Sequence, residues 1–432
     1  MSTSVTPPID TQVQSPLAHL SEQQLEELAR EFDAIRDRVM NELGDRDRRY
    51  IESMIEMQRR LAVLGRILLL ASRNRAGWTV GTAALSAAKI LENMEIGHNV
   101  MHGQWDWMND PRIHSSTWDW DTASTAEAWK HSHNYVHHTY TNIRGKDKDL
   151  GYEIMRIDPA QRWQPVYLAQ PLYNLILMAL FEWGVALHDL DIEAIRKGRK
   201  SMGQVKRELK GIAGKAKDQA VKDYIAWPLV SALAATAVDA VVAARRQRKR
   251  PRGLLGRAKR RKRQGRWAPV VEAALTSGAK TFRQTAKADA TANIVRNVWA
   301  YAIIFCGHFP DQTYTFSQRE VENESRGGWY VRQLTGSANI EGSPLFHVAS
   351  GNLGYQVEHH LFPDMPSTRY AEIAPQVKEV CERYGLPYNS GPFLQQLGMV
   401  QRTILRLAFP GGRPRPKPGP YRGENGGGEI VV

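Results

Sequence analysis

Apolar and polar positions alternate with a helical period near the start of the chain. Ser21 and Gln24 have the spacing of an N-terminal capping box, and apolar residues recur at intervals of three and four from Leu25 to Leu43. This pattern predicts an amphipathic helix within a region that we bound at residues 18–55. The same periodicity from Tyr370 to Tyr384 predicts a second amphipathic helix near the other end of the chain.

Longer apolar runs predict helices that cross a membrane. The first two runs, Leu61–Ala71 and Trp78–Leu91, are separated by a short polar link and predict a transmembrane hairpin. The second run is about 21 Å long as a helix, which is short against roughly 30 Å of bilayer hydrocarbon. Arg66 interrupts the first run. The later runs are Pro165–Leu187, Tyr224–Ala244 and Ile294–Phe309.

Composition distinguishes the two terminal segments from the rest of the chain and shows where the net positive charge lies. Residues 1–17 are rich in Ser, Thr and Pro, and residues 409–432 are rich in Pro and Gly, so both are predicted to be disordered. Residues 245–266 contain thirteen Lys and Arg and no acid, and the remaining 45 of the 58 Lys and Arg equal the 45 Asp and Glu. The net charge of +13 is therefore local, and it predicts a patch facing anionic lipid or a solvated loop. We interpret residues 245–266 as a basic insertion in a membrane domain that spans residues 56–408.

The candidate chemistry lies in the histidines. The stretch Trp129–Thr141 reads WKHSHNYVHHTYT, and its HxxxHH spacing places two histidines on one face if the stretch is helical. The same spacing of four recurs in GHNVMHG, and QVEHHL adds an adjacent pair. A mononuclear zinc site needs three or four ligands, so this number of imidazoles with only two cysteines in the chain fits two metals better. The histidines of these three boxes are His98, His102, His131, His133, His137, His138, His359 and His360.

Boxes reading HxxxH, HxxxHH and QxxHH in this order resemble those of the integral-membrane fatty acid desaturases. The flanks agree, with HHTYTNIRGKDKDLGYE after the second box and NLGYQVEHHLFPDMPSTRY around the third. The resemblance runs from about Arg48 to Tyr388 outside the basic insertion and is closest to the bacterial stearoyl-CoA Δ9-desaturases. It implies an all-α integral membrane protein with about four transmembrane helices and a cytosolic helical cap that holds a di-iron site.

The resemblance also implies the metal ligands. Gln356 stands where the family has His or Gln, and it is a candidate to bind metal directly, through water or by supporting another ligand. His131 would point away from the cluster on a helix, which makes it a weaker candidate. Asp147 and Asp149 are candidates to orient ligating histidines, with a solvated loop as the alternative. The implied iron ligands in the boxes are His98, His102, His133, His137, His138, His359 and His360.

His308 belongs to no box but is predicted to complete the metal shell. It follows an apolar run that ends at Gly307, so it would emerge where a membrane helix stops. Related desaturases carry a histidine after their last span. By this resemblance His308 brings the number of histidine ligands to eight.

The topology follows from the requirement that the second and third boxes meet on one side of the membrane. An even number of spans must then separate them, and we predict that Pro165–Leu187 lies along the interface or re-enters. This arrangement puts the basic insertion on the far side, against the positive-inside rule. The alternatives either place the basic segment Arg196–Lys222 on the far side or move His308 there. The active site is predicted on the cytosolic side of a multi-pass cell-membrane protein.

The activity implied by the resemblance is that of an oxidoreductase. It would introduce a cis double bond into stearoyl- or palmitoyl-CoA at the Δ9 position, with molecular oxygen and two irons per chain. The sequence contains no HPGG haem-binding signature, so the electrons must come from an external donor of the ferredoxin or flavin-reductase type with NADPH. A front-end or linoleoyl-type acyl-lipid desaturase and a di-iron fatty acid hydroxylase remain alternatives, and a zinc-binding membrane protein is the non-enzymatic one. The predicted partners are an acyl-CoA or acyl-lipid substrate and the lipid bilayer, without nucleic acid.

Overall fold

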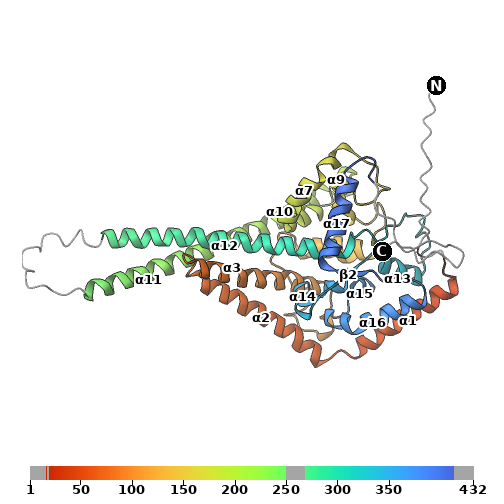
Figure 1. Cartoon of the computed structure of the whole chain (residues 1–432), viewed down its shortest axis with the longest axis horizontal. Coiled ribbons are helices and arrows are strands. Elements are labelled where there is room, and N and C mark those ends of the chain that lie inside the picture. The colour runs from red at the N-terminus through yellow and green to blue at the C-terminus, as the bar shows by residue number, and fades with distance from the viewer. Residues whose placement is uncertain (1–15, 17–18, 250–267, 413–432) are drawn as a thin grey trace, which may run out of the picture.

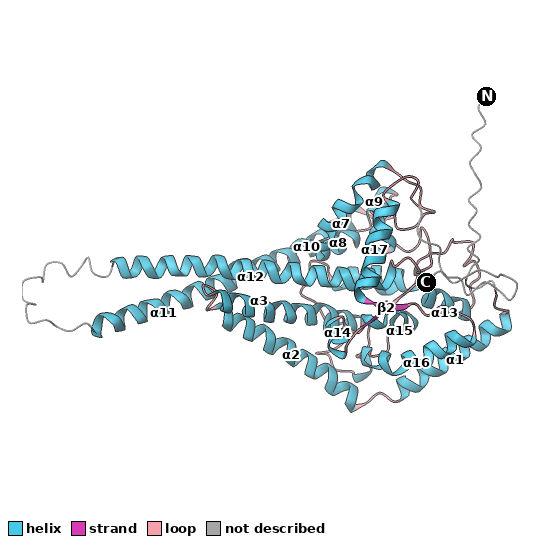
Figure 2. Cartoon of the chain, viewed as in Figure 1, coloured by secondary structure: helices cyan, strands magenta, loops and turns pink. Residues whose placement is uncertain are grey.

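The computed structural model describes residue 16, residues 19–249 and residues 268–412. The tails predicted at residues 1–17 and 409–432 and the basic insertion predicted at residues 245–266 lie mostly outside the described residues. Within the described chain, helices dominate, as the sequence predicts, and Figure 2 shows strands only in one small region.

Four long helices form an elongated bundle that extends from a compact helical cap (Figure 1). α2 packs along α3, α3 packs along α12, and α11 packs along α12. α12 has 41 residues and is therefore about 60 Å long. The helices of this bundle are α2 (Asp45–Leu69), α3 (Arg75–Ile90), α11 (Trp227–Lys249) and α12 (Ala268–His308).

The interior of the bundle contains paired charges. Arg66, which interrupts the first apolar run, lies 2.5 Å from Asp289 of α12 and 3.3 Å from Asp223. Lys89 of α3 also binds Asp223, at 2.8 Å. Both aspartates have no exposed side-chain area. Because a buried charge requires a partner, this network explains how Arg66 is tolerated within the apolar run of α2.

The cap begins with α1 (Glu22–Asn41), which confirms the first predicted amphipathic helix and its capping box. Its buried apolar face, which includes Leu28 and Phe32, packs into the same core as residues of α13 (Arg326–Thr335) and α16 (Tyr370–Arg383). α16 confirms the second predicted amphipathic helix. This core also includes residues of α15 (Gln356–Leu361), so it fixes the helix that carries the third histidine box.

The predicted interfacial segment is bent. After η5 (Pro165–Ala169), α7 (Gln170–Ala179) and α8 (Phe181–His188) follow, and the η5–α7 helix makes an angle of 102° with α8. Such a bend excludes one straight span across this segment. The helical stretch Met202–Ala243 is the one unbroken stretch in the described chain that is long and apolar enough to cross a membrane.

A short parallel sheet joins two distant parts of the cap. In it, β1 (Asn339–Glu341) pairs with β2 (Ser390–Pro392), with Asn339 opposite Ser390. β2 leads directly into α17 (Phe393–Leu407), which packs against α12 and α7. The other α-helices are α4 (Asn99–Met101), α5 (Ala126–Trp129), α6 (His138–Tyr140), α9 (Ile192–Arg196), α10 (Met202–Val221) and α14 (Pro344–Ala349). The π-helical turns are η1 (Leu91–His98), η3 (Lys130–His137) and η6 (Lys222–Ala226). The remaining 3-10 turns are η2 (Asp106–Met108), η4 (Leu150–Glu153), η9 (Leu353–Tyr355) and η10 (Ser367–Arg369).

Candidate metal centre

The three histidine boxes and His308 meet where the long helices enter the cap. The first box continues α3 through η1 and α4, and the second occupies η3 and the start of α6. The third box lies on α15, and His308 is the last residue of α12. The first two boxes are partly π-helical instead of forming the regular α-helix on which the spacing argument rested. Such π-turns occur frequently at functional sites.

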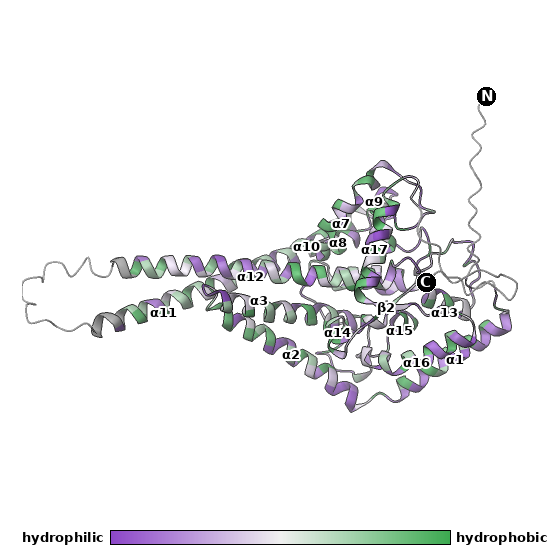
Figure 3. Ribbon diagram, viewed as in Figure 1, coloured by the Kyte–Doolittle hydropathy of each residue, from purple (hydrophilic) through white to green (hydrophobic). Residues whose placement is uncertain are grey.

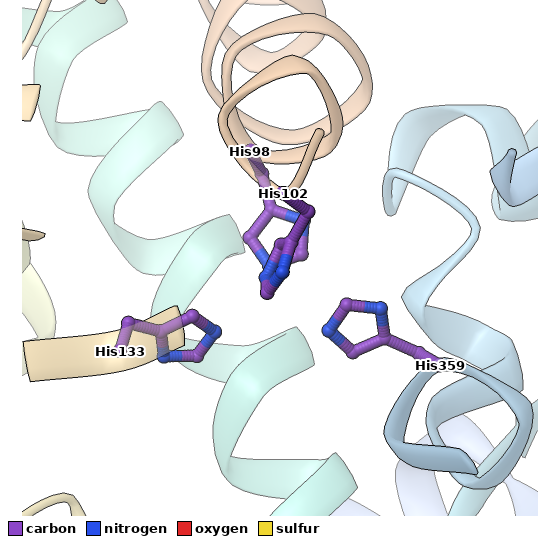
Figure 4. Close-up of side chains that lie close together, drawn as sticks. All are labelled: His98, His102, His133 and His359. Atoms are coloured by element: carbon purple, nitrogen blue, oxygen red, sulfur yellow. The ribbon is translucent and has the colours of Figure 1, made fainter. Parts of the chain in front are cut away.

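One group of imidazoles comes from all three boxes. Ligand nitrogens of His98, His102, His133 and His359 all lie within 4.8 Å of one another. Figure 4 shows the four rings directed toward a shared space, with the third-box ring opposite the second-box ring. Four nitrogens in this arrangement can hold one metal ion.

A second group adjoins the first. Ligand nitrogens of His137, His308 and His360 also lie within 4.8 Å of one another. His138 contacts both groups, because its ring centroid lies 4.8 Å from that of His102 and 4.6 Å from that of His360. The structure therefore brings together all eight of the predicted histidine ligands.

The ring nitrogens of these histidines have the properties of metal ligands. Both ring nitrogens of His138 are buried and have no hydrogen-bond partner. Burial lowers the pKa of His102, His138 and His359 well below the usual range, which favours the neutral imidazole that binds metals. Buried polar atoms are seldom left unpaired, so the donor set fits a pair of metal ions. Buried Nε2 atoms without partners belong to His102, His133, His137, His138, His359 and His360.

The two predicted aspartates contact the outer nitrogens of the second box. The Nδ1–H of His137 donates to Asp147 at 3.1 Å, and that of His133 donates to Asp149 at 3.2 Å. Burial alone would lower the pKa of His137, but the adjacent carboxylates of Asp147 and Asp149 raise it overall. Each contact fixes the orientation of the imidazole ring, so that its Nε2 is directed toward the other histidines of its group.

Other outer contacts were not predicted from the sequence. Nδ1 of His360 donates to the Gln333 side-chain oxygen at 3.0 Å, and Nδ1 of His359 contacts the Tyr370 hydroxyl at 3.2 Å. Gln333 comes from α13 and Tyr370 from α16, so only the packed cap brings them to the site. Gln333 belongs to no recognisable motif, and although Tyr370 ends the third-box flank NLGYQVEHHLFPDMPSTRY, nothing in that flank indicated its contact with His359.

The weaker candidate ligands lie in different places relative to the two imidazole groups. Nε2 of Gln356 lies 3.1 Å from Nε2 of His308, and its Oε1 is buried without a partner, so Gln356 stands at the edge of the second group. His131 is exposed and stacks on Tyr135 with a centroid distance of 5.8 Å, outside both groups. His188, which sequence reasoning left as an ordinary histidine, lies 3.0 Å from Asp149.

Comparison with known proteins decides the family. The fatty acid desaturase family model matches residues 76–247 and 211–392. The chain is 44% identical over 393 residues to the NADPH-dependent stearoyl-CoA 9-desaturase of Mycobacterium tuberculosis (strain ATCC 25618 / H37Rv), covering 91% of this chain and 82% of the relative. The chain belongs to the fatty acid desaturase family. It is therefore an oxidoreductase that desaturates acyl chains, as its histidine boxes predict.

More distant desaturases match shorter parts of the chain. Fatty acid desaturase 3 of Homo sapiens is 34% identical over 113 residues, which cover 26% of this chain and 24% of the relative. Acyl-lipid (9-3)-desaturase of Borago officinalis is 34% identical over 102 residues, which cover 24% of this chain and 21% of the relative. No solved structure matches the desaturase.

A narrow inner cavity leads from the metal centre of the desaturase along α8 and α12. His98, His133 and His308 line it at the metal end. Its walls are largely apolar and include aromatic rings from several elements. Such walls suit an acyl chain. The apolar lining includes Trp120, Trp129, Phe181, Val185, Ala300 and Ile304.

A second, outer cavity of about 650 Å³ adjoins the inner one. Ser132, His188 and Asp189 line both cavities, and Ser132 donates to Asp189 at 2.5 Å. The lining of the outer cavity includes four acidic side chains, Glu127, Asp189, Asp191 and Glu208, and an equal number of Lys and Arg side chains. Two of these, Arg199 and Arg207, form no ion pair with any described residue of the desaturase. The basic residues that line this cavity are Lys148, Arg199, Lys200 and Arg207.

Proposed function

We propose that this desaturase introduces a cis double bond at C9 of stearoyl- or palmitoyl-CoA, using two irons and molecular oxygen. The observation that carries the proposal is the pair of adjoining imidazole groups beside a cavity with apolar walls. The specificity is supported by the 44% identity to a relative whose name specifies stearoyl-CoA and position 9.

We assign the eight histidines as the iron ligands. His98, His102, His133 and His359 would hold one iron, and His137, His308 and His360 the other. His138 is the eighth ligand, because it contacts both groups with two unpartnered nitrogens. The chemistry that two bound irons supply is the oxygen-dependent removal of two hydrogens from unactivated C–H bonds, which acid–base side chains cannot perform.

The protein side chains provide orientation and a cavity with apolar walls. Asp147 and Asp149 accept hydrogen bonds from the Nδ1–H groups of His137 and His133. Each Nε2 is then unprotonated and free to bind a metal ion. Tyr370 and Gln333 contact the third-box histidines in the same way. The aromatic and aliphatic side chains that line the inner cavity would contact an acyl chain beside the metal centre.

We propose that the helix bundle crosses the membrane four times, by α2, α3, α11 with η6, and α12, and that the cap is cytosolic. Figure 3 shows hydrophobic turns along α11, and this helix exposes apolar side chains that include Leu233 and Val241. α2 exposes Val63 and Ile67 in the same manner. With α7 and α8 bent away from a straight span, α11 and α12 give the two crossings that keep the second and third boxes on one side.

The carrier of the acyl chain is best explained as coenzyme A. Arg199 and Arg207 line the outer cavity without ion-pair partners among the described residues, which suits the phosphates of a CoA head group. The electrons are proposed to come from NADPH through a separate ferredoxin or flavin reductase, because the mycobacterial relative is NADPH-dependent. Dioxygen accepts electrons both from the acyl chain and from this donor, and it leaves as water.

Purified protein in detergent tests the proposal directly. We expect two irons per chain by elemental analysis, and a cis-Δ9 product from stearoyl-CoA when oxygen, NADPH and a reductase are supplied. Gas chromatography with mass spectrometry of derivatised products locates the double bond. Turnover without oxygen, or full turnover with zinc as the sole metal, would contradict the proposal.

A further inference from the structure

One face of the last third of α12 lines the inner cavity. Arg296, Ala300, Ile304 and His308 follow one another at intervals of four, so they lie along one side of the helix. Twelve residues separate the first from the last, which corresponds to about 18 Å along the helix axis. His308 stands at the candidate metal centre, and Arg296 is the cavity-lining residue of α12 that lies farthest from it along the helix.

The end at Arg296 is closed by a buried ion pair. The guanidinium of Arg296 binds the carboxylate of Glu182 on α8, and the two side chains are only 2% and 4% exposed. Arg296 also donates to the backbone oxygen of Asp121 at 3.1 Å. Glu182 accepts a hydrogen bond of 2.9 Å from Gln219 on α10. Four segments of the chain therefore hold this pair in place.

A hydrocarbon chain would contact apolar side chains along the cavity and a buried ion pair at Arg296. Between His308 and Arg296 the cavity passes Ile304, Ala300 and Val185, which can contact methylene groups. At the end, a further methylene would have to separate Arg296 from Glu182 and leave both charges buried without a partner. Such separation is strongly unfavourable in a protein interior.

We propose that the Glu182–Arg296 pair is the stop for the methyl end of the acyl chain and thereby sets the longest chain that the enzyme accepts. This inference rests on the proposed desaturase function and adds the residues that determine its chain-length specificity. The length of α12 between His308 and Arg296 fixes how far the chain extends beyond the metal centre.

The test replaces the pair by apolar residues of similar size, with Glu182→Leu and Arg296→Met in one variant. Replacement of a buried ion pair by packed apolar residues commonly preserves folding. The purified holoenzyme is given equal amounts of 16-, 18-, 20- and 22-carbon acyl-CoAs in competition. We expect the ratio of 20-carbon to 18-carbon product to rise by about tenfold, because the closed end now accepts added methylenes. The double bond stays at the same carbon.

A second, independent variant is designed to shorten the preferred acyl chain. Ala300→Leu fills the cavity one helical turn before its end, so we expect the ratio of 16-carbon to 18-carbon product to rise. The matched control is Arg66→Met with Asp289→Leu, which removes a buried ion pair of the bundle that does not line the cavity. We expect this control to retain the chain-length profile of the wild type.

The outcomes separate this inference from the proposed function. If the wild type forms no unsaturated product from any of the acyl-CoAs, the proposed function fails. If the wild type is active and both cavity variants keep its chain-length profile with two irons bound, the Glu182–Arg296 stop is wrong. If the control variant changes the profile as much as the cavity variants do, the stop is also wrong, since general loosening of the bundle then explains the effect.

Discussion

His308 is the residue that joins the long helix α12 to the candidate metal centre. Its ring centroid lies 4.8 Å from those of both His137 and His360, so it completes the second imidazole group. We expect His308→Ala to lose iron and to lower turnover by more than about a hundredfold, since even residues outside the ligand shell cost up to that factor. Elemental analysis and stearoyl-CoA turnover on the same sample measure the two effects together.

His347 provides a matched control for this variant. It is a buried histidine of the cap that stacks on Tyr355 at 4.3 Å and belongs to neither imidazole group. His347→Ala is therefore expected to lower thermal stability while the surviving protein keeps two irons. Retention of two irons and wild-type turnover by His308→Ala would remove His308 from the ligand set.

At this scale the sequence revealed the eight histidines that the structure brings together and missed several residues that contact them. The histidines are visible because their spacing repeats, and Asp147 and Asp149 are visible because they follow the second box closely. Gln333 has no such signal, and the place of Tyr370 at the end of the third-box flank did not indicate its contact, because each reaches a histidine only through the packing of α13 or α16. His188 was likewise missed, although it binds Asp149 in the folded chain.

At the scale of elements, α12 shows where hydropathy is insufficient. The apolar pattern predicted a helix only from Ile294 to Phe309, whereas α12 begins at Ala268. Its earlier part, which packs against α3 and α11, buries a stripe of polar residues at intervals of four, and one of them, Asp289, binds Arg66 of α2. A search for apolar runs cannot find a helix whose buried face is polar. The residues of this stripe are Thr281, Thr285, Asp289 and Asn293.

The outer cavity carries the second element-scale prediction. Arg199 precedes α10 and Arg207 lies within it, and both line the cavity without ion-pair partners in the described chain. Reversing both charges, by Arg199→Glu with Arg207→Glu, should raise the KM for stearoyl-CoA by about tenfold, since roughly 1.4 kcal/mol of binding corresponds to that factor. The kcat should change little, because neither residue contacts the metal centre. Steady-state kinetics at low ionic strength measures both constants.

Lys206→Glu is the matched control for the outer cavity, because Lys206 is exposed on the same helix but does not line the cavity. Its KM should stay near that of the wild type. Raising the salt concentration should narrow the difference between wild type and the double variant, as expected for exposed charges. Equal KM values for all three proteins, or turnover of acyl-phospholipid in preference to acyl-CoA, would indicate that this cavity does not receive a CoA head group.

At the scale of the molecule, the sequence predicted the helical class and the meeting of the boxes. Each box lies at the end of a helix or in a turn. Because the boxes must meet on one side of the membrane, the sequence predicted that Pro165–Leu187 does not cross the membrane. The 102° bend between the helices of this segment agrees with that prediction. The short sheet that joins β1 to β2 was not predicted, because three-residue strands leave no periodic signal. The number of spans remains a proposal, because the polar interior of the bundle lowers the hydropathy of its helices.

The basic insertion of residues 245–266 is expected to act outside the chemistry. It holds thirteen Lys and Arg, contains no proposed ligand and accounts for the whole net charge of +13. Replacing it by a Gly/Ser linker of equal length should leave the double-bond position unchanged, because the metal centre and both cavities are built from other residues. Each basic residue near an anionic surface contributes about 1 kcal/mol, so the replacement should weaken stabilisation by anionic lipid. Thermal unfolding in nanodiscs with and without phosphatidylserine measures this effect, and product analysis on the same samples reports the double-bond position. A shifted double bond would show that the insertion helps to position the acyl chain.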